Sequence, residues 1–135
     1  MKIVMVINSE LPPGLIANTA AVLGISLGRG REDIVGGDIK DADGNLHPGI
    51  TARTVPVLAG SRDQIKSLRD NLFAPEYAAV SVVDFSEIAQ RCLDYDTYTQ
   101  MMSGLDSAEI YYHGVCLCGP AKMVSKITGN LKLLR

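Results

Sequence analysis

The sequence contains no tryptophan, only three cysteines and no long hydrophobic run. An odd number of cysteines, at positions 92, 116 and 118, does not form the disulfide framework of a small secreted domain. No stretch approaches the ~18 consecutive apolar residues of a membrane-spanning helix, and the apolar run at residues 2–8 is too short for the core of a signal peptide. We therefore expect a reduced, cytoplasmic protein without a membrane partner.

An excess of basic residues is also missing. The chain has 13 lysines and arginines against 15 aspartates and glutamates, which gives a formal net charge of −2. Proteins that depend on phosphate contacts normally carry a basic domain or stripe. This balance argues against a nucleic-acid partner, although a local basic patch could still bind one.

Segments with strand and helix patterns alternate along almost the whole chain. A length of 135 residues fits one domain, residues 1–135, that buries about 68% of its unfolded surface. The expected strands are 2–8, 54–58, 78–83 and 109–118, with a β-hairpin over 34–50 around the turn 41–45; the expected helices are 15–27, 61–74, 84–92, 95–102 and 119–135. This order is typical of a three-layer α/β/α sandwich with a mostly parallel mixed sheet.

The last seventeen residues form the most distinctive stretch. Gly119 permits a sharp turn out of a buried strand, and Pro120 suits the first helical position. The stretch resembles the C-terminal helix of the type II (archaeal and eukaryotic) peptidyl-tRNA hydrolases, which ends in Gly-Pro-Ala…Lys-[hydrophobic]-Thr-Gly-x-Leu-Lys-Leu. The positions that fit this pattern are Gly119, Pro120, Ala121, Lys126, Thr128, Gly129, Leu131, Lys132 and Leu133.

The resemblance extends, more weakly, over most of the chain. The opening Lys2-Ile-Val-Met-Val is similar to the first strand of the hydrolases, and Val82-Val83-Asp84 to the strand end that carries their active-site aspartate. The segment 34–58 is similar to a small bacterial family of unassigned function related to the hydrolases, and the chain resembles that family most. The resemblance implies a peptidyl-tRNA hydrolase II-like fold and a homodimer.

Two departures from the hydrolase pattern bear on activity. The hydrolases have two lysines at the start of the first helix, one of them held to be essential, where this chain has Leu15 and Ala17. Their loop after the aspartate is replaced here by helix-forming sequence over 85–105, which could be a lid, a dimer contact or a plug. A fixed cation near a scissile carbonyl typically supplies several kcal/mol to ester hydrolysis. A lysine or arginine reaching Asp84 from elsewhere, in an open cleft, would remove this argument for lost activity.

Ligands of open α/β sheets collect beyond the carboxyl ends of parallel strands. We expect a ligand site at this rim, with Asp84 as the candidate catalytic residue. The expected ligand-binding residues are Asn8, Ser9, Glu10, Asn18, Cys118 and Gly119. Asp84 also fits the N-cap of a helix, a role compatible with the first. Cys118 precedes a helix start, which favours a thiolate, yet buried cysteines mostly act as small hydrophobic residues.

No motif specifies a cofactor or a metal. The 41–45 segment lacks the glycine and glutamate of a calcium-binding EF-hand loop, and the cysteine spacing does not suit structural zinc. Three functions remain open: a hydrolase relative without peptidyl-tRNA hydrolase activity that binds an unidentified small molecule or a partner at the rim, an aminoacyl- or peptidyl-ester hydrolase using Asp84, and a structural subunit acting through its dimer surface.

Overall fold

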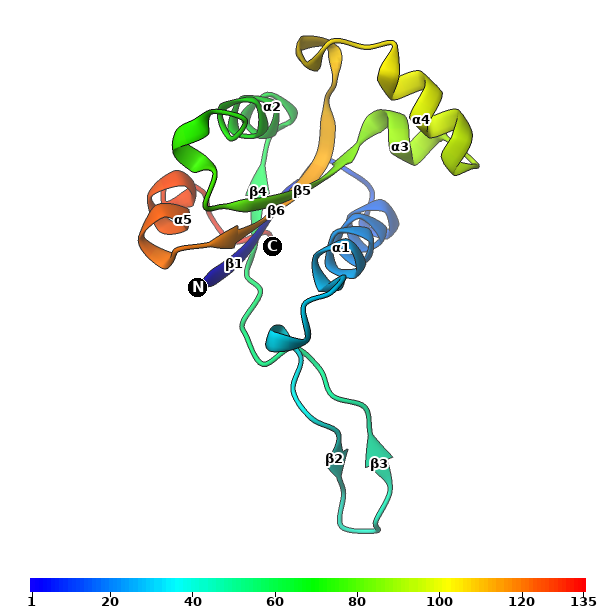
Figure 1. Cartoon of the computed structure of the whole chain (residues 1–135), viewed down its shortest axis with the longest axis vertical. Coiled ribbons are helices and arrows are strands. Elements are labelled where there is room, and N and C mark those ends of the chain that lie inside the picture. The colour runs from blue at the N-terminus through cyan, green and yellow to red at the C-terminus, as the bar shows by residue number, and fades with distance from the viewer.

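The computed structural model describes all 135 residues, and its centre is a four-stranded sheet (Figure 1). The strands lie in the order β4-β1-β6-β5, with β1 parallel to β4 and β6 antiparallel to both of its neighbours. Their bounds are β1 Lys2–Asn8, β4 Val57–Gly60, β5 Ser81–Ser86 and β6 Tyr112–Gly119. The expected mixed α/β sheet is confirmed, but only β1 and β4 pair in parallel, because β6 runs against the other three strands.

Helices cover both faces of this sheet. Figure 1 shows α2 and α5 on one side and α1 on the other. The helices are α1 Pro13–Gly28, α2 Arg62–Asn71, α3 Glu87–Arg91, α4 Tyr95–Ser103 and α5 Ala121–Thr128, with single 3₁₀ turns η1 Glu32–Ile34, η2 Pro75–Tyr77 and η3 Ser107–Glu109. None of them is long and apolar enough to cross a lipid bilayer.

The side chains of β1 alternate between two separate cores. Val4 and Val6 pack with the helices α2 and α5, whereas Ile3, Met5 and Ile7 pack with α1. This two-sided burial explains why β1 reads as a continuous apolar run, and its bounds agree with the sequence-based expectation.

The first turn of α2 also follows directly from the sequence. Ser61 Oγ accepts a hydrogen bond from the Gln64 backbone N–H at 3.1 Å, and Gln64 Oε1 accepts one from the Ser61 N–H at 2.9 Å. This reciprocal capping box satisfies two backbone donors at the helix start, and the predicted box is therefore confirmed.

The expected capping role of Asp84 is wrong. Strand β5 continues to Ser86, and the Ser86 hydroxyl instead caps α3 by accepting the Ala89 N–H at 3.0 Å. Asp84 lies within the strand, opposite Val115 of β6. The strand extends this far because Phe85, on the α1 side, continues its buried alternation.

The C-terminal helix is shorter than expected. Helix α5 ends at Thr128, and the residues after Gly129 run along the free edge of β4 instead. Leu133 forms a bridge with Leu58, and the Leu134 N–H donates to the Val57 carbonyl at 2.9 Å. Edge strands with unpaired backbone groups attract other chains, so this tail protects β4.

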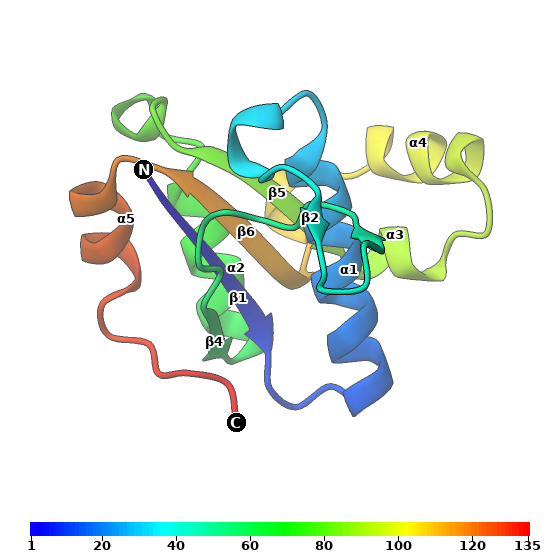
Figure 2. The same cartoon turned by 90° about the horizontal axis from the view of Figure 1, so that it is seen from below.

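Residues 35–54 form a projection that we call the arm. Its short strands, β2 Ile39–Lys40 and β3 Leu46–His47, pair antiparallel as the hairpin prediction expects. Figure 1 shows the arm extending away from the body, and Figure 2 shows it from below, at the α1 side of the sheet.

Candidate functional site

The residues expected at one rim are distributed over both ends of the sheet. Because β6 is antiparallel to β1, Gly119 pairs with Lys2 and Cys118 with Ile3, at the start of β1. Asn8 lies at the opposite end, paired with Gly60. The structure therefore does not bring Cys118 and Gly119 together with Asn8, Ser9, Glu10 and Asn18, since the rim prediction assumed a parallel last strand.

The remaining rim residues have local structural roles or face solvent. The Asn8 side chain is buried, and its Oδ1 accepts the Glu10 N–H at 3.0 Å. The Ser9 N–H donates to the Gly60 carbonyl at 3.2 Å. Ser9, Glu10 and Asn18 are exposed, and none of the four lines the pocket described below.

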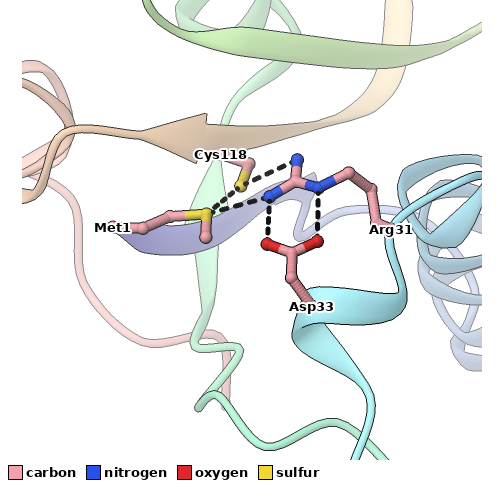
Figure 3. A network of polar contacts seen from close by, with 4 residues as sticks. All are labelled: Met1, Arg31, Asp33 and Cys118. Atoms are coloured by element: carbon pink, nitrogen blue, oxygen red, sulfur yellow. Dashed lines mark hydrogen bonds and ion pairs between the residues drawn. The ribbon is translucent and has the colours of Figure 1, made fainter.

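Cys118 lies in a compact polar network (Figure 3). Its Sγ is 3.1 Å from Met1 Sδ and accepts a 3.7 Å hydrogen bond from Arg31 Nη1. Arg31 also donates to both carboxylate oxygens of Asp33, at 3.0 and 3.2 Å. The hydrogen bond to Asp33, and to a smaller extent the one to Cys118, raises the pKa of Arg31. The same Arg31–Asp33 hydrogen bond lowers the pKa of Asp33. Cys118 is 3% exposed, so the network joins the start of β1, the end of β6 and η1 without leaving the thiol open to a substrate.

The other cysteines do not form a metal centre. Burial raises the pKa of the Cys116 thiol to about 12, so this thiol is protonated at neutral pH and packs as a small hydrophobic group. Cys92 lies between α3 and α4, away from the other two in the chain. No group of three or more His, Cys, Asp or Glu side chains is placed to hold a metal ion.

A pocket of about 370 Å³ lies along the edge strand β5. It is bounded by α1 on one side and by the α3–α4 segment on the other. The lining residues are Val22, Ser26, Val83, Asp84, Phe85, Ala89, Cys92, Leu93, Asp94, Tyr95 and Tyr98. Successive strand side chains point to opposite faces, so a pocket that touches the consecutive residues 83–85 opens at the edge of the sheet. Its volume falls within the range of small-molecule sites.

Asp84 is paired with a cation that the sequence analysis did not identify. Arg69 Nε on α2 donates to Asp84 Oδ2 at 2.7 Å, and the two side chains are 13% and 19% exposed. The Arg69 guanidinium also packs 3.9 Å over the Phe73 ring. A signal was present in the sequence: Arg69 is adjacent to Leu68 and four residues from Ile65, which places it beside the inward stripe of α2.

Two tyrosines lie near this pair, and a second carboxylate lines the same pocket. Burial, with a further contribution from the Asp84 charge, raises the pKa of Tyr98, and that of Tyr112 to about 12. Both are therefore neutral phenols at neutral pH. Asp94 accepts hydrogen bonds from the Thr97 N–H at 2.8 Å and the Thr97 hydroxyl at 2.9 Å, which lower its pKa. The pocket thus contains two carboxylates, and no Lys, Arg or His lines it.

The comparisons with known proteins agree with this architecture. Residues 1–135 match the model of a family described as "Protein of unknown function (DUF2000)". The chain belongs to the DUF2000 family. A solved structure of a protein of unknown function from Agrobacterium tumefaciens resembles this DUF2000 chain with a TM-score of 0.87 and 19% identity, over 98% of this chain and 96% of that one. None of the curated proteins matches the chain. These findings establish the family and the fold.

A second polar cluster of the DUF2000 domain lies where β4 and β5 end. Arg62 donates from Nε and Nη2 to the Glu87 carboxylate at 2.8 and 2.9 Å, and its guanidinium lies 3.6 Å over the Tyr111 ring. The nearby His113 is 8% exposed, packs against Phe85 with ring centroids 5.9 Å apart, and its Nδ1 has no hydrogen-bond partner. This cluster ties the starts of α2 and α3 to the residue that precedes β6, and of the residues named here only Phe85 lines the pocket.

Proposed function

We propose that this chain binds a small, largely apolar molecule that is neutral or positively charged, in the pocket between α1, β5 and the α3–α4 segment. The pocket's lining carries this proposal. Val22, Val83 and Phe85 supply apolar surface from α1 and β5, and the two tyrosines of α4 add aromatic faces. Sites for small molecules are mostly apolar with a few placed polar groups, as this one is.

The electrostatics of the pocket favour cations over anions. Asp94 carries a negative charge that its hydrogen bonds stabilise. Tyr95 and Tyr98 form an edge-to-face pair with ring centroids 5.5 Å apart, and aromatic faces attract organic cations. A polyanion such as peptidyl-tRNA would be repelled by this negative charge, which supports the absence of peptidyl-tRNA hydrolase activity in this chain.

The segment that replaces the hydrolase loop acts as a wall in this proposal. Ala89, Cys92 and Leu93 of the α3–α4 region line the pocket from the side opposite α1. The segment therefore contributes to a binding cavity next to Asp84 and leaves it open, which supports the role of a wall over that of a plug.

An ester hydrolase that uses Asp84 is the second candidate, and the Arg69 contact favours it. The chain lacks the first-helix lysines of the hydrolases, but Arg69 brings a cation to within 2.7 Å of the Asp84 carboxylate. The missing cation is therefore no longer an argument against hydrolysis. The negative charge of the pocket remains an argument against hydrolysis, because ester hydrolysis develops negative charge that basic groups stabilise.

A matched pair of fluorescent probes tests the binding proposal. N-phenyl-1-naphthylamine is uncharged, and 8-anilino-1-naphthalenesulfonate adds a sulfonate to the same skeleton. We expect the uncharged probe to bind roughly tenfold or more tightly than the sulfonate, a difference of about 1.4 kcal/mol. Asp94→Asn keeps an N-cap residue but removes the charge, so it should narrow this difference.

Pocket-filling variants locate the probe. Because the chain has no tryptophan, Ala89→Trp both fills the pocket and reports on it, whereas Ala108→Trp places the same residue at an exposed position outside the pocket. Binding that survives Ala89→Trp contradicts the proposal. Turnover of a peptidyl-tRNA or a model ester that disappears in folded Asp84→Ala would establish the hydrolase instead.

A further inference from the structure

The arm is a two-stranded antiparallel ribbon whose paired positions share one register. Val35 bridges to Thr51, Ile39 pairs with His47, and Lys40 pairs with Leu46. The two residue numbers of each pair add up to the same value, so one register runs from the root of the arm to its turn. The Gly36 N–H donates to the Ile50 carbonyl at 2.8 Å within the same register.

Both faces of this ribbon carry exposed aliphatic side chains. Alternation along the strands puts Val35 and Ile39 on one face and Leu46 and Ile50 on the other. Their exposed fractions are 49%, 62%, 65% and 74%. Apolar side chains on both faces are typical of a strand that is buried on both faces. The faces of the arm, however, have no neighbour in the same copy.

Beyond its root, the arm has no support from the rest of the chain. Hydrogen bonds of residues 36–50 stay within the arm, including His47 Nε2 to Asp41 Oδ2 at 2.8 Å and the Gly49 N–H to Asp38 Oδ1 at 2.9 Å. An isolated two-stranded hairpin is at best marginally stable in water. The apolar faces therefore need a surface that the same copy does not provide.

We propose that the arm binds a second copy of this chain and that two copies embrace each other symmetrically. The surface that it meets is the apolar flank, which we define as Ile25 of α1 with Leu93 and Tyr95 of the α3–α4 segment. These side chains are 79%, 102% and 78% exposed. Leu93 and Tyr95 line the pocket, and Ile25 is adjacent in α1 to Ser26, which lines the pocket too.

The size of the arm suits a dimer of this kind. Six residues per strand at about 3.4 Å each make the ribbon roughly 20 Å long, and two strands are about 10 Å wide. Each face then covers about 200 Å². Two arms, each with one face on the partner's flank, and the surfaces they cover amount to on the order of 800 Å², the size of a weak, concentration-dependent dimer. Because each copy carries both an arm and a flank, a twofold arrangement closes with two contacts and leaves none unsatisfied.

Sedimentation equilibrium over roughly a hundredfold range of micromolar concentrations tests this dimer, because the average mass of a reversibly associating chain depends on its concentration. We expect the unmodified chain to be dimeric. Ile39→Lys combined with Ile50→Lys puts one charge on each face of the arm, and should raise the dimer dissociation constant at least about 100-fold. Both positions are exposed, so the body keeps its fold. Lys40→Ser combined with His47→Ser changes polar neighbours on the same ribbon and should leave the mass unchanged.

Two further variants separate the parts of the proposal. Replacing residues 37–49 with Asn-Gly closes the ribbon directly after the Gly36–Ile50 pair and removes the arm; this chain should be monomeric. Leu93→Lys combined with Tyr95→Lys charges the flank and should also give monomers. A monomeric unmodified chain, or a dimer that persists without the arm, overturns the proposal. A dimer that persists with the charged flank overturns the assignment of the arm's binding surface.

Discussion

The Arg69 guanidinium reaches across from α2 to the edge strand β5 and holds the Asp84 carboxylate at 2.7 Å. Aspartate is depleted in strands, so Asp84 would be an unusual residue inside β5 without this contact. The ion pair explains both how a carboxylate is accommodated between Val83 and Phe85 and why α2 and β5 are joined at this point. It is a structural link at the border of the candidate pocket.

The Arg69–Asp84 pair should be worth more to the fold than an ordinary surface pair. Arg69→Met leaves a mostly buried carboxylate without its cation, and should lower the free energy of unfolding by about 2–3 kcal/mol, somewhat less than for a fully buried pair. The double variant Arg69→Met with Asp84→Leu removes both charges and should recover much of the loss. Urea unfolding followed by circular dichroism measures both. A single variant as stable as the unmodified chain contradicts the structural role.

Acid should weaken the fold through His113. Burial lowers the pKa of this imidazole, and the neighbouring Glu87 charge opposes the shift only in part. The unfolded chain takes up the proton near the ordinary value of about 6.5, whereas the folded chain takes it up only at lower pH. The unfolded state therefore binds more protons in this window, and the free energy of unfolding falls as pH drops through it, by at most about 1.4 kcal/mol per pH unit.

The variant His113→Phe isolates this effect, because it keeps an aromatic ring against Phe85 but removes the titrating group. Its unfolding free energy should be flatter between about pH 7.5 and the pH at which carboxylates begin to titrate. Glu87, whose pKa is lowered chiefly by its Arg62 hydrogen bond from an ordinary value of 4.5, acts only below that window. An unchanged slope in His113→Phe would assign the acid sensitivity to another group.

Helix α1 lies close to the sheet at Gly114, and a methyl group there should destabilise the fold. A Cβ at this position would lie 2.9 Å from Thr19 Cγ2 and 3.0 Å from the Val6 carbonyl oxygen. Gly114→Ala should therefore cost about 1–3 kcal/mol, as overpacking of a core does. Gly24→Ala on α1 is the matched control, since its nearest neighbour is Met5 Cε at 3.8 Å.

The control should be neutral or slightly stabilising, because alanine is the better helix former by about 0.5–1 kcal/mol. Thr19→Ser removes the Cγ2 methyl and keeps the hydroxyl that donates to the Leu15 carbonyl at 2.7 Å. It should partly restore the Gly114→Ala variant. Thermal unfolding of the unmodified chain, Gly114→Ala, Gly24→Ala and the double variant Gly114→Ala with Thr19→Ser compares these effects. Equal losses of stability at Gly114 and Gly24 would show that the close approach of α1 to the sheet is not the cause.

The local features of this fold could be predicted from the sequence, because they depend on neighbouring residues. The bounds of β1 follow from an unbroken apolar run, the Ser61–Gln64 capping box from its spacing, and the arm from the turn at Asp41–Asn45. The direction of β6 could not, since a buried strand shows the same apolar pattern in either orientation. Because this direction was unknown, the prediction put Cys118 at the same end of the sheet as Asn8, whereas the two residues lie at opposite ends.

The candidate pocket was harder to predict than the fold. Only Asp84 of its lining was among the expected site residues. The others come from the middle of α1 and from the α3–α4 segment, and no spacing rule brings these together before the sheet order is known. The expectation that Asp84 caps a helix failed for a similar reason, because only the Arg69 contact from another element makes a carboxylate favourable inside β5.

The tail after α5 should be needed to keep β4 from pairing with other chains. The Ala59 N–H donates to the Lys132 carbonyl at 2.8 Å, and the Leu134 N–H donates to the Val57 carbonyl at 2.9 Å. Removing residues 131–135 frees these β4 groups and uncovers Leu58, so we expect association at high protein concentration. We also expect the free energy of unfolding to fall by about 2–4 kcal/mol, because Leu131 and Leu134 each pack against a core.

Leu133→Lys is the control: this side chain is 51% exposed, so the substitution keeps the backbone pairing and should change stability by no more than about 0.5 kcal/mol. Light scattering and thermal unfolding distinguish the two chains, and a truncated chain that stays monodisperse and equally stable would show that β4 needs no cover.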